Sequence, residues 1–147
     1  MSARPALLDV NVLIALLDTE HIHHLDAREW LTANIASGWA SCAITQMGAV
    51  RVMSGSRYPA DLSTRAALEL VAAATATKHH VWWPCDIAIT DPSHVDATHL
   101  LGPGQIIDSY LLALAVKHGG RFVTFDRRVS LAPVPAATAE HLVVLPG

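Results

Sequence analysis

The chain has 147 residues, of which 52% are hydrophobic and 16% charged, and its net charge is −3 at pH 7. This balance fits one folded domain over residues 1–147 and excludes an intrinsically disordered chain, which would be poor in apolar residues. It also argues against a broad basic surface for passive nucleic-acid binding, but an enzyme can still hold phosphates through bound cations.

We expect no targeting or membrane segment. The N-terminal sequence MSARPALLDV does not resemble a signal peptide, and no apolar run reaches the roughly 18 residues that span a bilayer. Cys42 and Cys85 match neither a disulfide framework nor a metal-site spacing. The expectation is therefore a cytoplasmic protein with two buried, reduced thiols and no contact with a membrane.

Apolar runs alternate along the chain with segments in which apolar residues recur at helical spacing. In chain order, strands are predicted over residues 6–10, 39–44, 79–84, 121–125 and 141–145. Helices are predicted over residues 11–18, 21–36, 45–54, 62–77 and 106–118, with a cap at Thr45 and a short further helix between Pro92 and Gly102. This alternation predicts an α/β fold of three layers, with a mostly parallel central sheet of about four to five strands and helices on both faces.

Three aspartates are predicted to meet at the carboxyl edge of this sheet, where functional groups of parallel α/β folds collect. Asp9 ends the first strand, Asp108 lies in the first turn of the helix over 106–118, and Asp126 directly follows the strand over 121–125. At about 1.5 Å per helical residue and about 3.3 Å per strand residue, that helix and that strand have nearly equal lengths. The chain therefore runs down and back and returns Asp108 and Asp126 to one edge.

Clustered carboxylates repel one another and are costly to desolvate, and a hard divalent cation resolves both problems. Oxygen-only ligands suit Mg²⁺ or Mn²⁺, which can activate a water and neutralise a scissile phosphate. Asp9, Asp108 and Asp126 are therefore predicted to hold Mg²⁺ or Mn²⁺ in a nuclease site. Each acid alone could instead be structural: Asp9 as a helix cap, Asp108 as a partner of a helix dipole, Asp126 as a turn residue.

Two polar residues accompany the acids and are further candidates for the site. Asn11 follows Asp9 by two positions and could order a metal-bound water, contact the substrate or cap its own helix. Thr124 precedes Asp126 by two positions, so its hydroxyl could hydrogen-bond within the site, although β-propensity alone would also explain a threonine there.

At these residues the sequence resembles the PIN-domain family, and specifically the VapC-type toxin ribonucleases of type II toxin–antitoxin systems. The resemblance covers almost the whole chain and rests on LLDVNVLIALL (7–17), the histidines and tryptophan within 21–30, ITQMGAVRVMS (44–54), IIDSYLLALAVKHGGRFVTFD (106–126) and the closing strand. It implies a PIN-like fold and a metal-dependent endoribonuclease that cleaves RNA, with the same three aspartates as its acidic residues. It also implies a cognate VapB-type antitoxin, commonly a small DNA-binding protein whose tail covers the active site.

One residue departs from the family pattern. Many relatives carry a glutamate early in the helix after the second strand, and Gln46 stands at the matching position. Glutamine can donate or accept a hydrogen bond but brings no charge. We therefore expect Gln46 to limit metal occupancy, which favours one ion, or a second ion recruited by the RNA phosphate.

Histidines near the start of the second helix resemble part of a hydrolase zinc motif. His21, His23, His24 and Asp26 fit that motif, but Ala27 stands where a further histidine is needed. A polar start of the helix is therefore favoured over a zinc site.

Aromatic and basic residues outside the acidic group offer further contacts. Trp82 and Trp83 are predicted to lie on opposite faces of their strand, one in the core and the other facing a partner or, less favoured, an RNA base. The best candidates for contacts with phosphate are four arginines near the predicted cleft: Arg51, Arg57, Arg127 and Arg128. For Arg57 and Arg128, a purely solvated position on the surface is an equally favoured alternative.

Three functions compete. The first is the metal-dependent ribonuclease of a toxin–antitoxin pair; the second is a catalytically weak PIN scaffold that binds RNA or a protein without cleavage, which Gln46 keeps open. A doubly wound phosphatase or phosphoacceptor is disfavoured, because the chain has Asp9-Val10-Asn11-Val12-Leu13 where a phosphatase has DxDxT. A symmetric homodimer is the default expectation for the oligomeric state.

Overall fold

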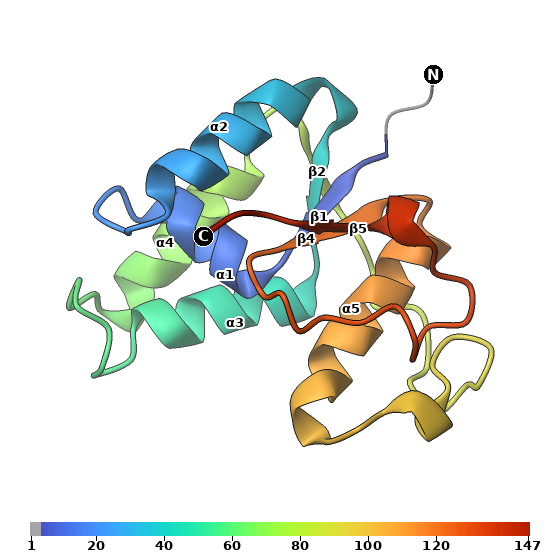
Figure 1. Ribbon diagram of the computed structural model, residues 1–147. Helices are drawn as coiled ribbons and strands as arrows, with labels where there is room; N and C mark the ends of the chain where they lie inside the picture. Colours follow the sequence, from blue (N-terminus) through green and yellow to red (C-terminus); the bar gives the residue numbers. More distant parts are fainter. Residues whose placement is uncertain (1–3) are drawn as a thin grey trace.

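A five-stranded parallel sheet runs through the centre of the protein in the computed structural model, which describes residues 4–147 (Figure 1). The strands follow the order β3-β2-β1-β4-β5, and every neighbouring pair is parallel. Their bounds are β1 (Ala6–Leu8), β2 (Trp39–Ser41), β3 (His80–Trp82), β4 (Arg121–Thr124) and β5 (Leu142–Val144). The helices are α1 (Val10–Leu17), α2 (His24–Asn34), α3 (Ala43–Met53), α4 (Thr64–Thr75) and α5 (Ile106–Lys117).

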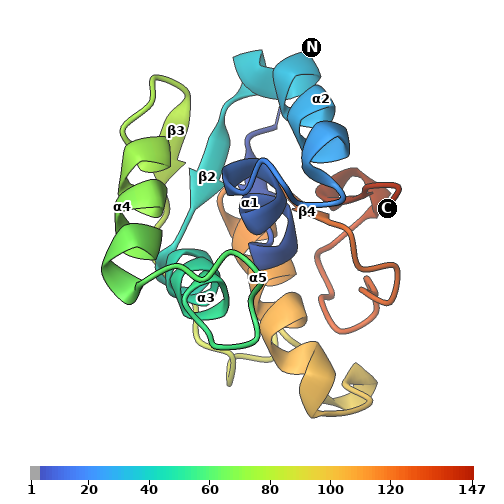
Figure 2. The same ribbon diagram turned by 90° about the vertical axis from the view of Figure 1, so that its left-hand side faces the viewer.

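Helices cover both faces of the sheet, as predicted for the α/β fold. Figures 1 and 2 show α1 to α4 on one face and α5 on the other. Strand residues alternate between the two cores: Ala6 and Leu8 pack with α1 to α4, whereas Leu7 packs with α5. The register keeps this alternation across the sheet, because Leu7 pairs with Phe122, which also faces α5.

Helix α5 is buried almost all round, unlike the amphipathic α4. Seven consecutive residues from Ser109 to Ala115 are buried in α5, which is typical of a helix enclosed by protein on every side. The segments before and after α5 supply its outer cover, through residues such as Val95 and Val134. This enclosure holds α5 from Ser109 onward against the sheet, while the first turn, which carries Asp108, stays partly open, with Ile106 and Ile107 exposed.

Two predicted helix features are wrong, and local hydrogen bonds explain both. Helix α3 is capped by Cys42 rather than Thr45, because Thr45 lies one turn inside the helix and accepts from the Cys42 N–H at 3.0 Å. The single helix expected between Pro92 and Gly102 is replaced by turns and a short 3-10 helix (Ala97–His99), because Asp91 and Asp96 each accept from the backbone N–H two residues on, at 3.0 Å. Such bonds compete with helix formation.

The predictions for the tryptophans and cysteines have mixed outcomes. Trp83 is buried in the core and Trp82 is 50% exposed, so their placement on opposite sides is confirmed. Cys42 is buried, but Cys85 is exposed, which corrects the expectation of two buried thiols. Cys85 lies in the loop that follows β3, outside the packed sheet.

From residue 4 onward, none of the helices has the length and apolarity needed to cross a membrane. Residues 1–3, at the start of the N-terminal stretch for which no signal peptide is expected, lie outside the described part of the chain.

Candidate active site

Three carboxylates that are far apart in the sequence come together at the carboxyl edge of the sheet. Asp9 directly follows β1, Asp126 follows β4 by two positions, and β1 and β4 are neighbours. Asp108 is in the first turn of α5. Burial raises the pKa of Asp9, and the nearby charge of Asp126 raises it further. Burial, followed by the charges of Asp9 and Asp126, raises the pKa of Asp108 to about 6.

Asp9 is held by a buried hydroxyl and a helix N-terminus. Its Oδ1 accepts from the Val10 N–H at 2.7 Å, so Asp9 caps α1, as its structural alternative predicted. Its Oδ2 accepts from the Thr124 hydroxyl at 2.7 Å. Both hydrogen bonds lower the pKa of Asp9 and oppose the larger effect of burial.

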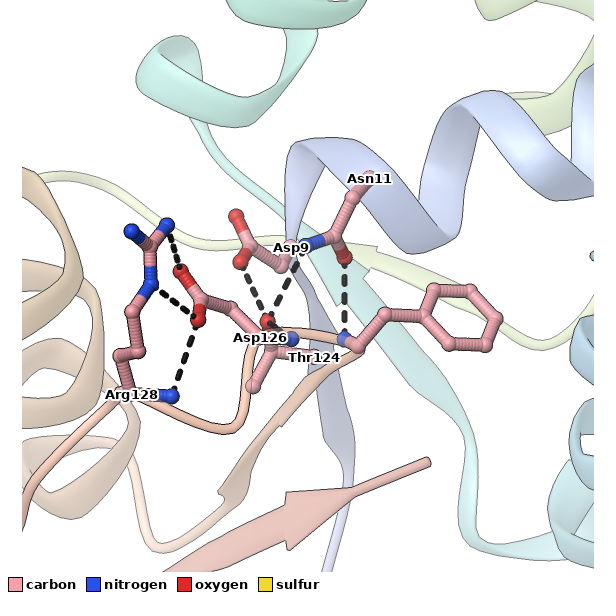
Figure 3. Close-up of polar contacts among 6 residues, drawn as sticks. Asp9, Asn11, Thr124, Asp126 and Arg128 are labelled. Carbon is pink, nitrogen blue, oxygen red and sulfur yellow. Dashed lines mark hydrogen bonds and ion pairs between the residues drawn. The ribbon is translucent and has the colours of Figure 1, made fainter. Parts of the chain in front are cut away.

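The Thr124 hydroxyl joins three segments at this point (Figure 3). Besides donating to Asp9, its oxygen accepts from the Asn11 amide at 3.2 Å and from the Asp126 N–H at 3.0 Å. Asn11 in turn accepts from the Phe125 N–H at 3.2 Å. Asn11 therefore ties α1 to the end of β4, and Asp9 rather than Asn11 caps the helix.

Asp126 is paired, and Asp108 is not. Arg128 Nε and Nη2 donate to the two carboxylate oxygens of Asp126 at 3.0 and 3.2 Å, and the Arg128 N–H donates to Oδ1 at 2.9 Å. These bonds hold the pKa of Asp126 below its usual range. Asp108 makes no hydrogen bond or ion pair with any residue from 4 to 147. The site therefore contains one carboxylate without a partner.

A pocket of about 220 Å³ opens between the start of α5 and the loop after β4. Asp108, Asp126 and Arg128 line it together with small polar residues. Ser109 and Ser130 are among these and were not predicted as site residues. Ser109 could have been found as the residue next to Asp108, whereas Ser130 lies in a loop with no local signal.

The donor set suits a hard divalent cation in its chemistry. Asp9, Asp108 and Asp126 offer only oxygen atoms, and the pKa of the unpartnered Asp108 is raised by burial first and then by the other two charges. As the side chains lie, no three His, Cys, Asp or Glu groups within residues 4–147 stand close enough to hold one ion. Both oxygens of Asp9 and both of Asp126 are hydrogen-bonded.

Comparison with known proteins decides the family. Residues 6–134 match the PIN domain. The chain is 54% identical over 140 residues to Ribonuclease VapC44 of Mycobacterium tuberculosis, an alignment that covers 95% of this chain and 99% of that protein. The chain belongs to the PIN-domain family.

Two solved structures share the fold of this PIN domain. The crystal structure of Mycobacterium tuberculosis VapC20, described as a sarcin–ricin loop cleaving toxin, superposes with a TM-score of 0.58 at 15% identity, covering 90% of this chain and 98% of that one. VapBC2 from Rickettsia felis, bound to a DNA fragment from its promoter, superposes with a TM-score of 0.60 at 10% identity, covering 96% of this chain and 98% of that one. At these identities the likeness is one of fold.

Gln46 of this PIN domain lies at the same sheet edge but bonds to a different neighbour. Its Nε2 donates to Ser41 Oγ, at the end of β2, at 2.9 Å. Ser41 Oγ lies 2.7 Å from His80 Nε2, and burial lowers the pKa of that histidine, which also bonds the Thr75 backbone. Gln46 makes no hydrogen bond to Asp9, Asp108 or Asp126.

The remaining candidates are distributed over the surface. Of the four arginines, Arg128 lines the acidic pocket, whereas Arg51 and Arg57 line a separate groove at the end of α3. In the histidine-rich segment, His24 Nδ1 lies 2.8 Å from the Ala15 carbonyl, and His23 stacks on Phe125 with ring centres 5.0 Å apart. These two histidines therefore make structural contacts.

Replacing Asp108 by asparagine should stabilise the metal-free protein at neutral pH. The folded protein binds the Asp108 proton more tightly than the unfolded chain does, so stability is lost as pH rises from about 4 towards about 6. Asp108→Asn removes that loss, so at pH 7 the free energy of unfolding of the variant should exceed that of the parent by about 1 kcal/mol after allowance for solvent screening. Near pH 4 the two proteins should be equally stable. Urea unfolding with chelator across this range measures the difference, and parallel curves for the two proteins would contradict it.

Thr124→Val should weaken the protein and change the titration of Asp9. Valine has the shape of threonine but leaves Asn11 and the Asp126 N–H without their acceptor, at a cost of about 1–3 kcal/mol. The pKa of Asp9 should rise further, because its hydroxyl donor is lost. Carbon-detected NMR titration of the carboxyl measures this. Thr124→Ser keeps the hydroxyl and serves as the control, with Asp9 titrating as in the parent.

Gln46→Glu should raise the pKa of His80. A carboxylate cannot donate to Ser41, so the Ser41 hydroxyl must turn towards it and His80 must supply a proton at Nε2. NMR titration of the imidazole gives the result, and an unchanged pKa would show that Gln46 does not control this network.

The same variant tests the expected limit on metal occupancy: cleavage at lower Mg²⁺ supports that limit, and overlapping Mg²⁺ curves rule it out.

Proposed function

We propose that this PIN domain is an endoribonuclease of the VapC type that depends on Mg²⁺ or Mn²⁺ and acts as the toxin of a toxin–antitoxin pair. The observation that carries the proposal is that Asp108 and Asp126 line one pocket, with Asp108 unpartnered and within reach of the charges of both Asp126 and Asp9. The 54% identity to Ribonuclease VapC44 supports ribonuclease activity. RNA is the substrate class that this name indicates.

The chain's own residues prepare the site for a phosphodiester. Asp9, Asp108 and Asp126 would hold the cation, which when bound polarises a phosphate and activates a water. Thr124 and the Val10 N–H fix the orientation of the Asp9 carboxylate without any metal. Arg128, at the rim of the pocket, offers a guanidinium that matches phosphate geometry. Asn11 holds the end of β4 against α1 and so keeps Asp126 near Asp9.

A VapB-type antitoxin is the proposed partner. VapBC2, which shares the fold, was solved bound to a DNA fragment from the promoter. A basic side chain of an antitoxin would find an uncompensated carboxylate at Asp108, and it could replace the cation there electrostatically. A homodimer of the toxin remains the default for its assembly.

The alternative is a PIN scaffold that binds RNA without cutting it. The absence of a carboxylate at Gln46, whose amide is occupied by Ser41, is the observation that favours it. Cation-dependent cleavage separates the two functions.

Cleavage should require a divalent cation and each aspartate of the site. We expect chelator to abolish cleavage of total RNA, Mg²⁺ or Mn²⁺ to restore it, and Asp9→Asn or Asp108→Asn to reduce it about 100-fold or more, because each removes one charged ligand. Calorimetry with Mn²⁺ should show weaker binding in both variants.

Asp61→Asn is the matched control. Asp61 is exposed, lies between α3 and α4, and has a positive φ of 51°, a conformation that asparagine also tolerates. The Asp61→Asn variant should cleave RNA and bind Mn²⁺ as the parent does. RNA binding without cleavage at any cation concentration would favour the scaffold, and unchanged Mn²⁺ affinity in both site variants would exclude the metal site.

A further inference from the structure

Arg128 makes a charged, two-pronged contact with Asp126, one member of the acidic group. Its guanidinium engages both oxygens of Asp126, at 3.0 and 3.2 Å, in the two-pronged geometry that arginine forms with carboxylates. Yet the Arg128 side chain is 91% exposed, while Asp126 is 25% exposed. No other hydrogen bond or ion pair within residues 4–147 holds this guanidinium. It is therefore held by Asp126 alone and is free to leave.

The other two carboxylates have no mobile partner of this kind. Asp9 is satisfied by a backbone N–H and by the fully buried Thr124, which cannot move without disturbing the sheet. Asp108 has no partner within the described chain. Of the three acids, Asp126 is thus the one whose availability depends on a surface side chain.

We propose that Arg128 is a latch: a positioning residue that occupies Asp126 in the metal-free protein, is displaced when a divalent cation takes that carboxylate, and then binds the RNA phosphate. The proposal rests on the proposed function, because it assumes that Asp126 serves a cation. The physical basis is competition, since the oxygens that bond the guanidinium are the same ones that a cation needs.

Once a cation has displaced Arg128 from Asp126, the guanidinium would lie beside the position of the RNA phosphate. Arg128 lines the same pocket as Asp108 and Asp126, and a freed guanidinium can engage phosphate as readily as carboxylate. RNA would then pull Arg128 off Asp126 and assist the cation, while the cation would release Arg128 for RNA. Cation and RNA would bind cooperatively, and each would raise the affinity of the other by the same factor.

The next residue provides a matched control. Arg127 is also exposed and carries the same charge, but it makes no ion pair with Asp126 or with any other residue from 4 to 147. Arg127→Gln therefore removes the same long-range charge as Arg128→Gln while keeping the latch.

Mn²⁺ calorimetry without RNA tests the latch directly. We expect Arg128→Gln to bind Mn²⁺ about three- to tenfold more tightly than the parent, a range set by exposed but bidentate ion pairs. Arg127→Gln should bind as the parent does, apart from a small effect of net charge. In chelator, Arg127→Gln should unfold thermally as the parent does, because Arg127 makes no ion pair with any residue from 4 to 147, whereas Arg128→Gln should be slightly less stable because it loses the pair with Asp126.

Repeating the Mn²⁺ calorimetry in the presence of a nuclease-resistant, phosphorothioate-linked RNA oligonucleotide tests the proposed cooperativity between cation and RNA. That RNA should raise the Mn²⁺ affinity of the parent and of Arg127→Gln, and should raise that of Arg128→Gln less. Equal Mn²⁺ affinities in the parent and Arg128→Gln, or equal increases in the two arginine variants, would overturn the latch while leaving the metal site in place. Failure of all three proteins to bind Mn²⁺ would overturn the proposed metal dependence and the latch with it.

Discussion

The hydrogen bond from the buried Thr124 hydroxyl to Asp9 joins the ends of the two central strands, and the geometry of the acidic site depends on it. Thr124 is fully buried, and its oxygen also accepts from Asn11 and from the Asp126 N–H. One hydroxyl thus sets the orientation of Asp9, the start of α1 and the turn that carries Asp126. Because a buried polar group without a partner is costly, this arrangement is strongly favoured over alternatives that separate its members.

The three aspartates of the site have different environments, although the charges act on one another. Asp9 is bound by buried donors, Asp126 by an exposed arginine, and Asp108 by no residue of the described chain. Burial raises the pKa of Asp108 to about 6, so the metal-free protein carries an electrostatic cost that a cation or a basic partner group can relieve. In the proposed metal site, the same group that weakens the fold would create the affinity for a cation.

The structural roles of these residues are compatible with the proposed metal site. Asp9 caps α1, Asp108 lies in the first turn of α5, and Asp126 accepts from a backbone N–H two residues on, as each structural alternative predicted. Parallel sheets place strand ends and helix starts at one edge. An acid that caps or complements a helix there also faces the pocket. The choice between cap and ligand was therefore not a true alternative for this PIN domain.

The sequence by itself determined the α/β class, the five strands and the placement of Asp9, Asp108 and Asp126 at strand ends and a helix start, because apolar periodicity is a local property. It did not determine the cap of α3, the turns that replace a helix after Pro92, or the partners of Gln46 and Asp126. Those depend on which side chains reach one another, as with Asp9 and Thr124, which are 115 positions apart. Only the tertiary structure decides such contacts, because the packing of distant segments, and not sequence spacing, sets the distance and direction of each hydrogen bond.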